Sequence, residues 1–183
     1  MIGVAVTEVG SAANPGEPSA WVRKWAGQIP AGGRVLDLAC GSGRHTRYLA
    51  SLNHVVEGVD VDASPLAELA RIPGVSVRSA DLEQGPWPYG EAEFAGVVVT
   101  NYLHRPSLSM LLRALAPGGV LIYETFALGN ERFGRPRNPN FLLLPGELLE
   151  AVRGKLHVIA YEDVLVRQPK PAALQRICAV RPA

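Results

Sequence analysis

The chain has 183 residues, which is enough for one domain with a substantial buried core. Its hydrophobic content of 48% and charged content of 19% are typical of a globular protein, and a formal net charge of +1 gives no electrostatic argument for binding nucleic acid or a membrane surface. No apolar run reaches the length of a membrane span, and Met1–Glu8 is too short and lacks the basic start of a signal peptide. Cys40, Cys178 and the four histidines show no disulfide framework and no metal-ligand spacing, so we expect a cytoplasmic protein without a metal site.

The first third of the chain predicts an arm, a helix and a strand–turn–helix unit. Residues 1–17 are rich in Ala, Gly, Ser and Pro and predict a flexible arm, followed by one domain over residues 18–183. Ser19 is placed to cap a helix that runs to Ala26. Arg34–Leu38 then predicts a buried strand, which leads through small residues into a helix with His45, Leu49 and Leu52 on one face.

The rest of the chain alternates further strands and helices and ends in two consecutive strands. Ser64-Pro65 predicts a helix start with proline at the first position, and Pro106 begins a helix that carries Leu115 and ends at Pro117–Gly119. The other expected strands are 54–60, 75–80, 94–100, 120–126, 156–166 and 174–180, and the last expected helix is 145–152. The rigid turn over residues 168–171 joins the last two strands as an antiparallel hairpin. The alternation predicts a doubly wound, Rossmann-like, mostly parallel α/β sheet of seven strands with a C-terminal antiparallel hairpin.

Four polar residues lie at or just after the carboxyl ends of the expected parallel strands: Asp37, Asp60, Asp81 and Asn101. Ligands of such sheets bind outside these ends, near the point where the strand order reverses. The glycines that follow the first strand, Gly41 and Gly43, let backbone N–H groups approach a ligand at a helix N-terminus. A dinucleotide-binding motif would need a third glycine at Thr46, and an acid inside the strand suits a ligand with a positively charged end.

The pattern Asp37-Leu-Ala-Cys-Gly-Ser-Gly43 resembles the first motif of class I S-adenosylmethionine-dependent methyltransferases, and the predicted fold resembles theirs over residues 19–181. The compact size resembles the small-molecule branch of the family, including the tellurite-resistance type. The resemblance implies S-adenosylmethionine as the cofactor and a small-molecule acceptor. It implies that Asp37 and Ala39, Cys40, Gly41, Ser42 and Gly43 hold the methionine part, that Asp60, followed by Val61, takes the ribose hydroxyls, and that Asp81 with Leu82 flanks the adenine. Asn101 would lie beneath the sulfonium, and Arg44 and His45 could reach the cofactor carboxylate.

Candidates for the acceptor side of the site come from two later segments. His104, with Tyr102 beside it, follows the fourth parallel strand and could act as a general base if the acceptor must lose a proton. The long loop 127–144 is expected to close over the substrate, and its three arginines, Arg132, Arg135 and Arg137, could grip an anionic acceptor.

Several alternatives remain open at this point. A methyltransferase acting on RNA or protein is disfavoured by the net charge near zero and by the lack of an Asn/Asp-Pro-Pro-Tyr motif after the fourth strand. A cofactor-binding partner subunit without its own catalysis is disfavoured by the intact acids, and a nicotinamide oxidoreductase by the absent third glycine. The sequence does not indicate the acceptor or the oligomeric state.

Overall fold

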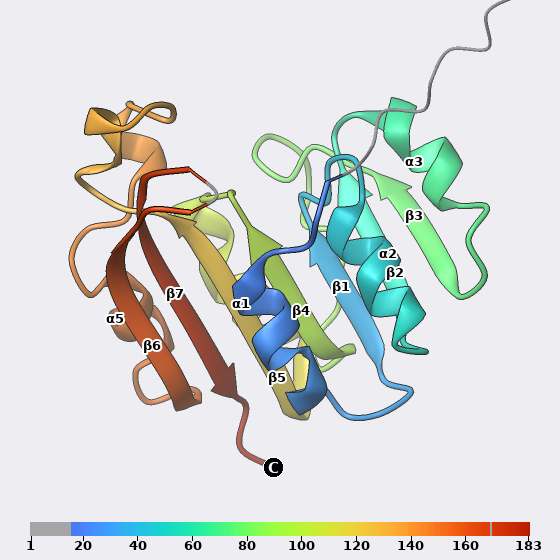
Figure 1. Ribbon diagram of the computed structural model, residues 1–183. Coiled ribbons are helices and arrows are strands. Elements are labelled where there is room, and N and C mark those ends of the chain that lie inside the picture. The colour runs from blue at the N-terminus through green and yellow to red at the C-terminus, as the bar shows by residue number, and fades with distance from the viewer. Residues whose placement is uncertain (1–15, 169) are drawn as a thin grey trace, which may run out of the picture.

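The computed structural model describes residues 16–168 and 170–183, so residues 1–15 of the expected arm and Pro169 of the expected turn lie outside the described residues. Seven strands form one sheet in the order β3-β2-β1-β4-β5-β7-β6 (Figure 1). The first five strands in the chain pair in parallel, whereas β7 lies antiparallel to both β5 and β6. This arrangement confirms the doubly wound, mostly parallel sheet with a C-terminal hairpin.

The bounds of the regular elements follow the hydrophobic pattern closely. The strands are β1 Arg34–Leu38, β2 Val55–Asp60, β3 Val75–Ser79, β4 Phe94–Thr100, β5 Leu115–Phe126, β6 His157–Val166 and β7 Ala172–Val180. The α-helices are α1 Ala20–Trp25, α2 Arg44–Ser51, α3 Ala63–Leu69, α4 Leu108–Ala114 and α5 Glu147–Val152, and single 3₁₀ turns span Ala26–Gln28, Arg105–Ser107, Asn130–Arg132 and Pro139–Phe141. None of the helices in the described part of the chain is long and apolar enough to cross a membrane.

Two hydrophobic clusters cover the two faces of the sheet. Side chains of a strand point alternately to opposite faces, and in β1 Val35 belongs to the cluster beneath α1 and α2, while Leu36 and Leu38 belong to the cluster beneath α4 and α5. Trp21 anchors α1, because its ring is buried and its Nε1 donates a hydrogen bond of 3.2 Å to the Ile177 carbonyl of β7. The N-terminal helix is thereby fixed across the middle of the sheet (Figure 1).

Several of the expected element boundaries are wrong, and three of the differences have a local cause in the structure. Helix α3 begins at Ala63, because the Asp62 carboxylate accepts a hydrogen bond from the Ser64 N–H and caps it, so Pro65 is the third helical residue and not the first. Helix α4 ends at Ala114, because Leu115 already pairs with Phe94 as the first residue of β5. Leu52 lies beyond the end of α2 and is 40% exposed, so it does not share the buried face of His45 and Leu49.

Candidate cofactor and acceptor sites

The turn between β1 and α2 adopts a backbone conformation that favours glycine. Ala39, Gly41 and Gly43 have φ angles of +54°, +54° and +78°. A Cβ built on Gly41 would meet nothing within 4 Å, whereas one on Gly43 would lie 2.3 Å from the buried side chain of Leu69 in α3. Gly41 therefore leaves open space for a ligand, while Gly43 permits close packing of α2 against α3.

The two glycines give a matched prediction for stability. Alanine at either position adopts an unfavourable left-handed conformation at a cost of roughly 1–2 kcal/mol. Only Gly43→Ala also drives a methyl group into Leu69, so we expect it to cost a further 1–3 kcal/mol or so. Urea unfolding of both variants measures the difference. Equal losses of unfolding free energy in the two variants would contradict the packing role of Gly43.

Asp37 is a buried carboxylate, and one of its two oxygens has no hydrogen-bond partner among the described residues. Its side chain is 1% exposed, and Thr46 Oγ1 donates a hydrogen bond of 2.6 Å to Oδ2. Oδ1 is buried and has no hydrogen-bond partner among the described residues. Burial raises the pKa of Asp37 to about 6, although the Thr46 hydrogen bond acts in the opposite direction. An unsatisfied buried carboxylate beneath the glycine turn fits a ligand that brings positive charge to the turn.

Asp60 holds the glycine turn from the end of β2. Its Oδ2 accepts a hydrogen bond of 2.8 Å from the Gly41 N–H, and its Oδ1 accepts one of 3.1 Å from the Asp62 N–H. Each carboxylate oxygen has a further lone pair, so the side chain can still accept hydrogen bonds from a ligand. Asp60 lines the two adjoining cavities described next, which places those acceptor positions at a ligand surface.

Two adjoining cavities follow the carboxyl ends of β1, β2, β3 and β4, and they share Ala39, Asp60 and Tyr102. The first, of about 350 Å³, is lined also by Val61, Ala80, Asp81, Leu82 and Glu83. The second, of about 360 Å³, is lined also by Cys40, Gly41, Ser42, Arg44, His45, Thr100 and Asn101. Every residue predicted to bind the cofactor lines one of them except Asp37 and Gly43, which are both buried. We call the pair the cofactor cavities.

Asp81 adopts a turn geometry that preserves its charge. Its Oδ1 accepts hydrogen bonds of 2.9 Å from the Glu83 and Gln84 N–H groups, and these two bonds hold the pKa of the Asp81 carboxyl below its usual range. Leu82, directly after it, is almost completely buried and presents an apolar surface to the first cavity. Asp81 and Leu82 therefore place a negative charge next to an apolar surface in the first cavity.

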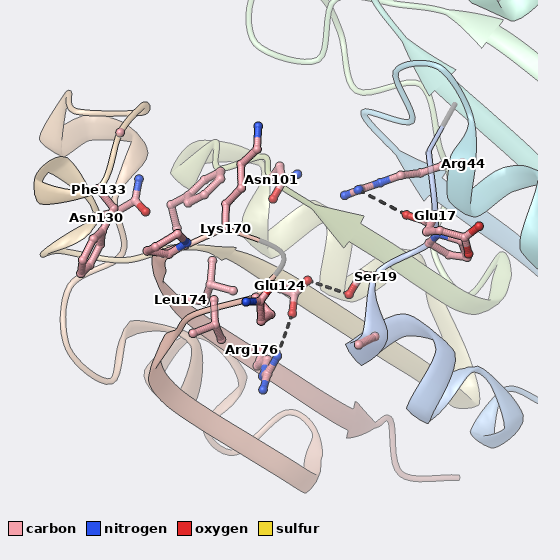
Figure 2. Close-up of a pocket in the computed structure, with 18 of the residues that line it drawn as sticks. Glu17, Ser19, Arg44, Asn101, Glu124, Asn130, Phe133, Lys170, Leu174 and Arg176 are labelled. Carbon is pink, nitrogen blue, oxygen red and sulfur yellow. Dashed lines mark hydrogen bonds and ion pairs between the residues drawn. The ribbon is translucent and has the colours of Figure 1, made fainter. Parts of the chain in front are cut away.

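A larger cavity of about 930 Å³ opens beside the cofactor cavities, and we call it the acceptor cavity. It shares Arg44 and Asn101 with the second cofactor cavity, so the two spaces meet at these side chains. Figure 2 shows Arg44 on one side, Asn101 between, and Lys170 with the segment that carries Asn130 and Phe133 on the other side. Asn101 has a φ of +55°, a conformation that asparagine tolerates better than most residues, and its N–H donates to the Glu124 carbonyl.

A hydrogen-bond network joins the acceptor cavity to the start of α2. Ser19 Oγ donates to Glu124 Oε1 at 2.6 Å, and Arg176 contacts Glu124 Oε2 at 3.3 Å. The Ser19 N–H donates to His45 Nε2 at 3.1 Å, so in its neutral form His45 carries its proton on Nδ1, which lies 3.2 Å from Thr100 Oγ1. Burial, together with a smaller effect of the nearby Arg44, lowers the pKa of His45 to about 3. His45 is therefore a neutral link between the N-terminal segment and β4, and a role at the cofactor carboxylate stays a prediction.

The two candidate general bases differ in their position. Tyr102 lines both cofactor cavities, and burial raises its pKa to about 12, so near neutral pH its phenol can donate a proton but cannot accept one. His104 is half-buried and lines none of the cavities described here, and its Nδ1 has no partner among the residues that the structure describes. Its role as a base stays a prediction.

Of the three loop arginines, one lines the acceptor cavity and two do not. All three are exposed, and Arg135 lines the cavity together with Phe133 and Gly134, whereas Arg132 and Arg137 do not. Part of the loop 127–144 therefore lines the cavity, and its closure over a bound acceptor stays a prediction. Lys170, Glu124 and Arg176 line the same cavity. Sequence reasoning missed Lys170 and Arg176, which lie on the hairpin and belong to no motif.

The fold is that of Rossmann-like methyltransferases of known structure. Solved structures with this fold include a methyltransferase from Mesorhizobium loti (TM-score 0.68, 17% identity, 88% of this chain and 98% of that chain). They also include TehB from Haemophilus influenzae (TM-score 0.70, 19% identity, 86% of this chain and 60% of that chain). A third is the 1,6-didemethyltoxoflavin-N1-methyltransferase of Burkholderia thailandensis, solved with its substrate and S-adenosylhomocysteine (TM-score 0.65, 21% identity, 90% and 79% coverage).

Residues 35–119 match the family model described as a methyltransferase domain, which confirms the resemblance seen in the sequence. The trans-aconitate 2-methyltransferase of Methylobacterium nodulans is 38% identical over 101 residues, which are 52% of this chain and 39% of that protein. An uncharacterized methyltransferase of Synechocystis is 39% identical over 102 residues, which are 50% of this chain and 46% of that protein. The chain thus spans less than half the length of these curated relatives.

Proposed function

We propose that this protein transfers a methyl group from S-adenosylmethionine to a small-molecule acceptor. The observation that carries the proposal is that the acceptor cavity and the cofactor cavities meet at Arg44 and Asn101. A donor in one space and an acceptor in the other can therefore face each other at a shared boundary. The match to the methyltransferase-domain model supports the same assignment.

The residues present fit this cofactor. The unsatisfied Asp37 carboxylate and the open backbone at Gly41 suit its positively charged methionine part. Asp60 offers acceptor positions for ribose hydroxyls, and Val61, Asp81 and Leu82 line the cavity suited to adenine. When bound, the cofactor supplies an activated methyl group on a sulfonium.

The chain's own contribution is then positioning and exclusion of water. An activated methyl group transfers by in-line displacement, which depends mainly on holding donor and acceptor in line. Asn101 lies at the shared boundary, and Phe126 and Phe133 supply apolar surface around the acceptor. This chemistry needs a base only when the acceptor must lose a proton.

The proposal extends to the organisation and location of the protein. We assign residues 18–183 to a single methyltransferase domain, because all seven strands belong to one sheet. A cytoplasmic location is supported by two buried thiols, Cys40 and Cys178, that are not joined in a disulfide. An RNA or protein acceptor fits the acceptor cavity less well, since a volume of about 930 Å³ is within the range for small ligands.

Release of S-adenosylhomocysteine in the presence of a panel of small metabolites tests the proposal. We expect product release with at least one small acceptor and none without an acceptor. Binding of the cofactor without turnover on any small molecule, combined with turnover on RNA or protein, would contradict the small-molecule assignment. Binding with no turnover on any acceptor class would identify a cofactor-binding subunit instead.

A further inference from the structure

Three positively charged side chains lie at the mouth of the acceptor cavity, and none of them forms an ion pair with a residue that the structure describes. Arg44 comes from the first turn of α2, Arg135 from the loop 127–144, and Lys170 from the turn between β6 and β7. Within the described ranges, none of the three forms an ion pair, and the Arg44 guanidinium only reaches the Glu17 carbonyl at 3.5 Å. Three separate segments thus contribute a cation without an ion pair to the lining of one cavity, and Figure 2 labels two of these cations, Arg44 and Lys170.

The remaining charged residues of the cavity are already paired. Arg176 lies between Glu124 at 3.3 Å and Glu162 at 2.5 Å, and its guanidinium stacks 4.9 Å from the Trp21 ring. Arg23 and Glu17 form an exposed pair at 3.4 Å. The positive charge available to a ligand is therefore that of Arg44, Arg135 and Lys170.

From this juxtaposition we infer that the acceptor is a small organic acid with two or more negatively charged groups, held at the mouth by Arg44, Arg135 and Lys170. This inference rests on the proposed function for the identity of the neighbouring cofactor. A guanidinium binds a carboxylate in a bidentate manner, and an ammonium binds it as a point charge. Phe126, Phe133 and Leu174 line the same cavity and suit a compact carbon skeleton between the acid groups. Arg44 borders both cavities, so an acid group bound there lies beside the cofactor.

The hairpin provides a matched control for Lys170. Val166, Gln168 and Lys170 line the cavity, whereas Arg167 between them is exposed and does not. Arg167 and Lys170 thus lie three residues apart in the same turn between β6 and β7, and only Lys170 lines the cavity. Lys170→Ala and Arg167→Ala remove the same charge from nearly the same place, and only the first removes it from the cavity.

Calorimetric titration with a tricarboxylate, trans-aconitate, and with its neutral trimethyl ester tests the inference, both with and without saturating S-adenosylhomocysteine. We expect the acid to bind and the ester not to bind, with an affinity that falls as salt is raised. Lys170→Ala and Arg135→Ala should each weaken binding of the acid by about three- to tenfold, and the double variant by more than tenfold, while Arg167→Ala leaves it unchanged.

The outcomes separate this inference from the proposed function. If S-adenosylhomocysteine binds and no tricarboxylate does, the inference is overturned and the proposed function stands. Carboxylate binding without any S-adenosylhomocysteine binding would preserve the anion site and remove the proposed function. Equal losses in Lys170→Ala and Arg167→Ala, or a loss in Arg137→Ala but not in Arg135→Ala, would show that the acid binds elsewhere and would also overturn the inference.

Discussion

Replacement of Asp60 by alanine should weaken the binding of S-adenosylhomocysteine by about ten- to a thousandfold. The reason is that a carboxylate that accepts ribose hydroxyls makes charge-assisted hydrogen bonds worth roughly 1.5–3 kcal/mol each. In this structure the same side chain also accepts hydrogen bonds from the Gly41 and Asp62 N–H groups, so the variant loosens the turn that faces the cofactor. Isothermal titration calorimetry measures the change in affinity directly.

Asp62 is the matched control for this experiment. It lies two residues further along the chain, carries the same charge and caps α3 by accepting from the Ser64 N–H, but it lines neither cofactor cavity. Asp62→Ala should lower the free energy of unfolding by about 1 kcal/mol through the lost cap and leave cofactor affinity within twofold. An Asp60→Ala variant that also kept its affinity within twofold would show that Asp60 is not the ribose ligand.

Replacement of Asp37 by asparagine should change how stability depends on pH. Burial raises the pKa of Asp37 from 3.8 to about 6 in the folded protein, so the folded state binds the proton more tightly than the unfolded chain does. Ionisation therefore opposes folding. The destabilisation is absent below about pH 4, grows between pH 4 and 6, and levels off above pH 6 at a value on the order of 3 kcal/mol. The neutral asparagine removes this contribution.

Urea unfolding of the cofactor-free protein between pH 4 and 8 measures the effect. We expect the free energy of unfolding of the wild type, relative to that of Asp37→Asn, to fall between pH 4 and 6. The same variant should bind S-adenosylhomocysteine more weakly at pH 7, because the ionised carboxylate that suits a positively charged ligand is gone. Parallel pH profiles for the two proteins would mean that Asp37 does not carry a raised pKa.

The sequence was sufficient to predict the sheet, its order of elements and most of the cofactor cavities. The reason is that buried parallel strands appear as continuous apolar runs, and that their carboxyl ends meet at one edge by topology. Asp60, Asp81 and Asn101 could thus be brought together before any geometry was known, and all three line the cavities described. The strained turn at Ala39, Gly41 and Gly43 was indicated by its small residues.

The acceptor side could not be predicted to the same depth, because its contacts join segments that are far apart in the chain. Ser19 meets Glu124 across 105 positions, and no local pattern marks such a pair. The loop arginines have equivalent sequence surroundings, and only the folded loop separates Arg135 from Arg132 and Arg137. His45 has a helical position that suggested exposure to a ligand, yet both of its ring nitrogens have protein partners.

The central claim is that the glycine turn and the acids around it bind S-adenosylmethionine, and one titration tests it most directly. S-adenosylhomocysteine and NAD are titrated separately into the wild-type protein and into Asp60→Ala. The account predicts binding of S-adenosylhomocysteine to the wild type at one site, at least tenfold weaker binding to the variant, and no heat from NAD. Binding of NAD together with no response to S-adenosylhomocysteine would contradict it.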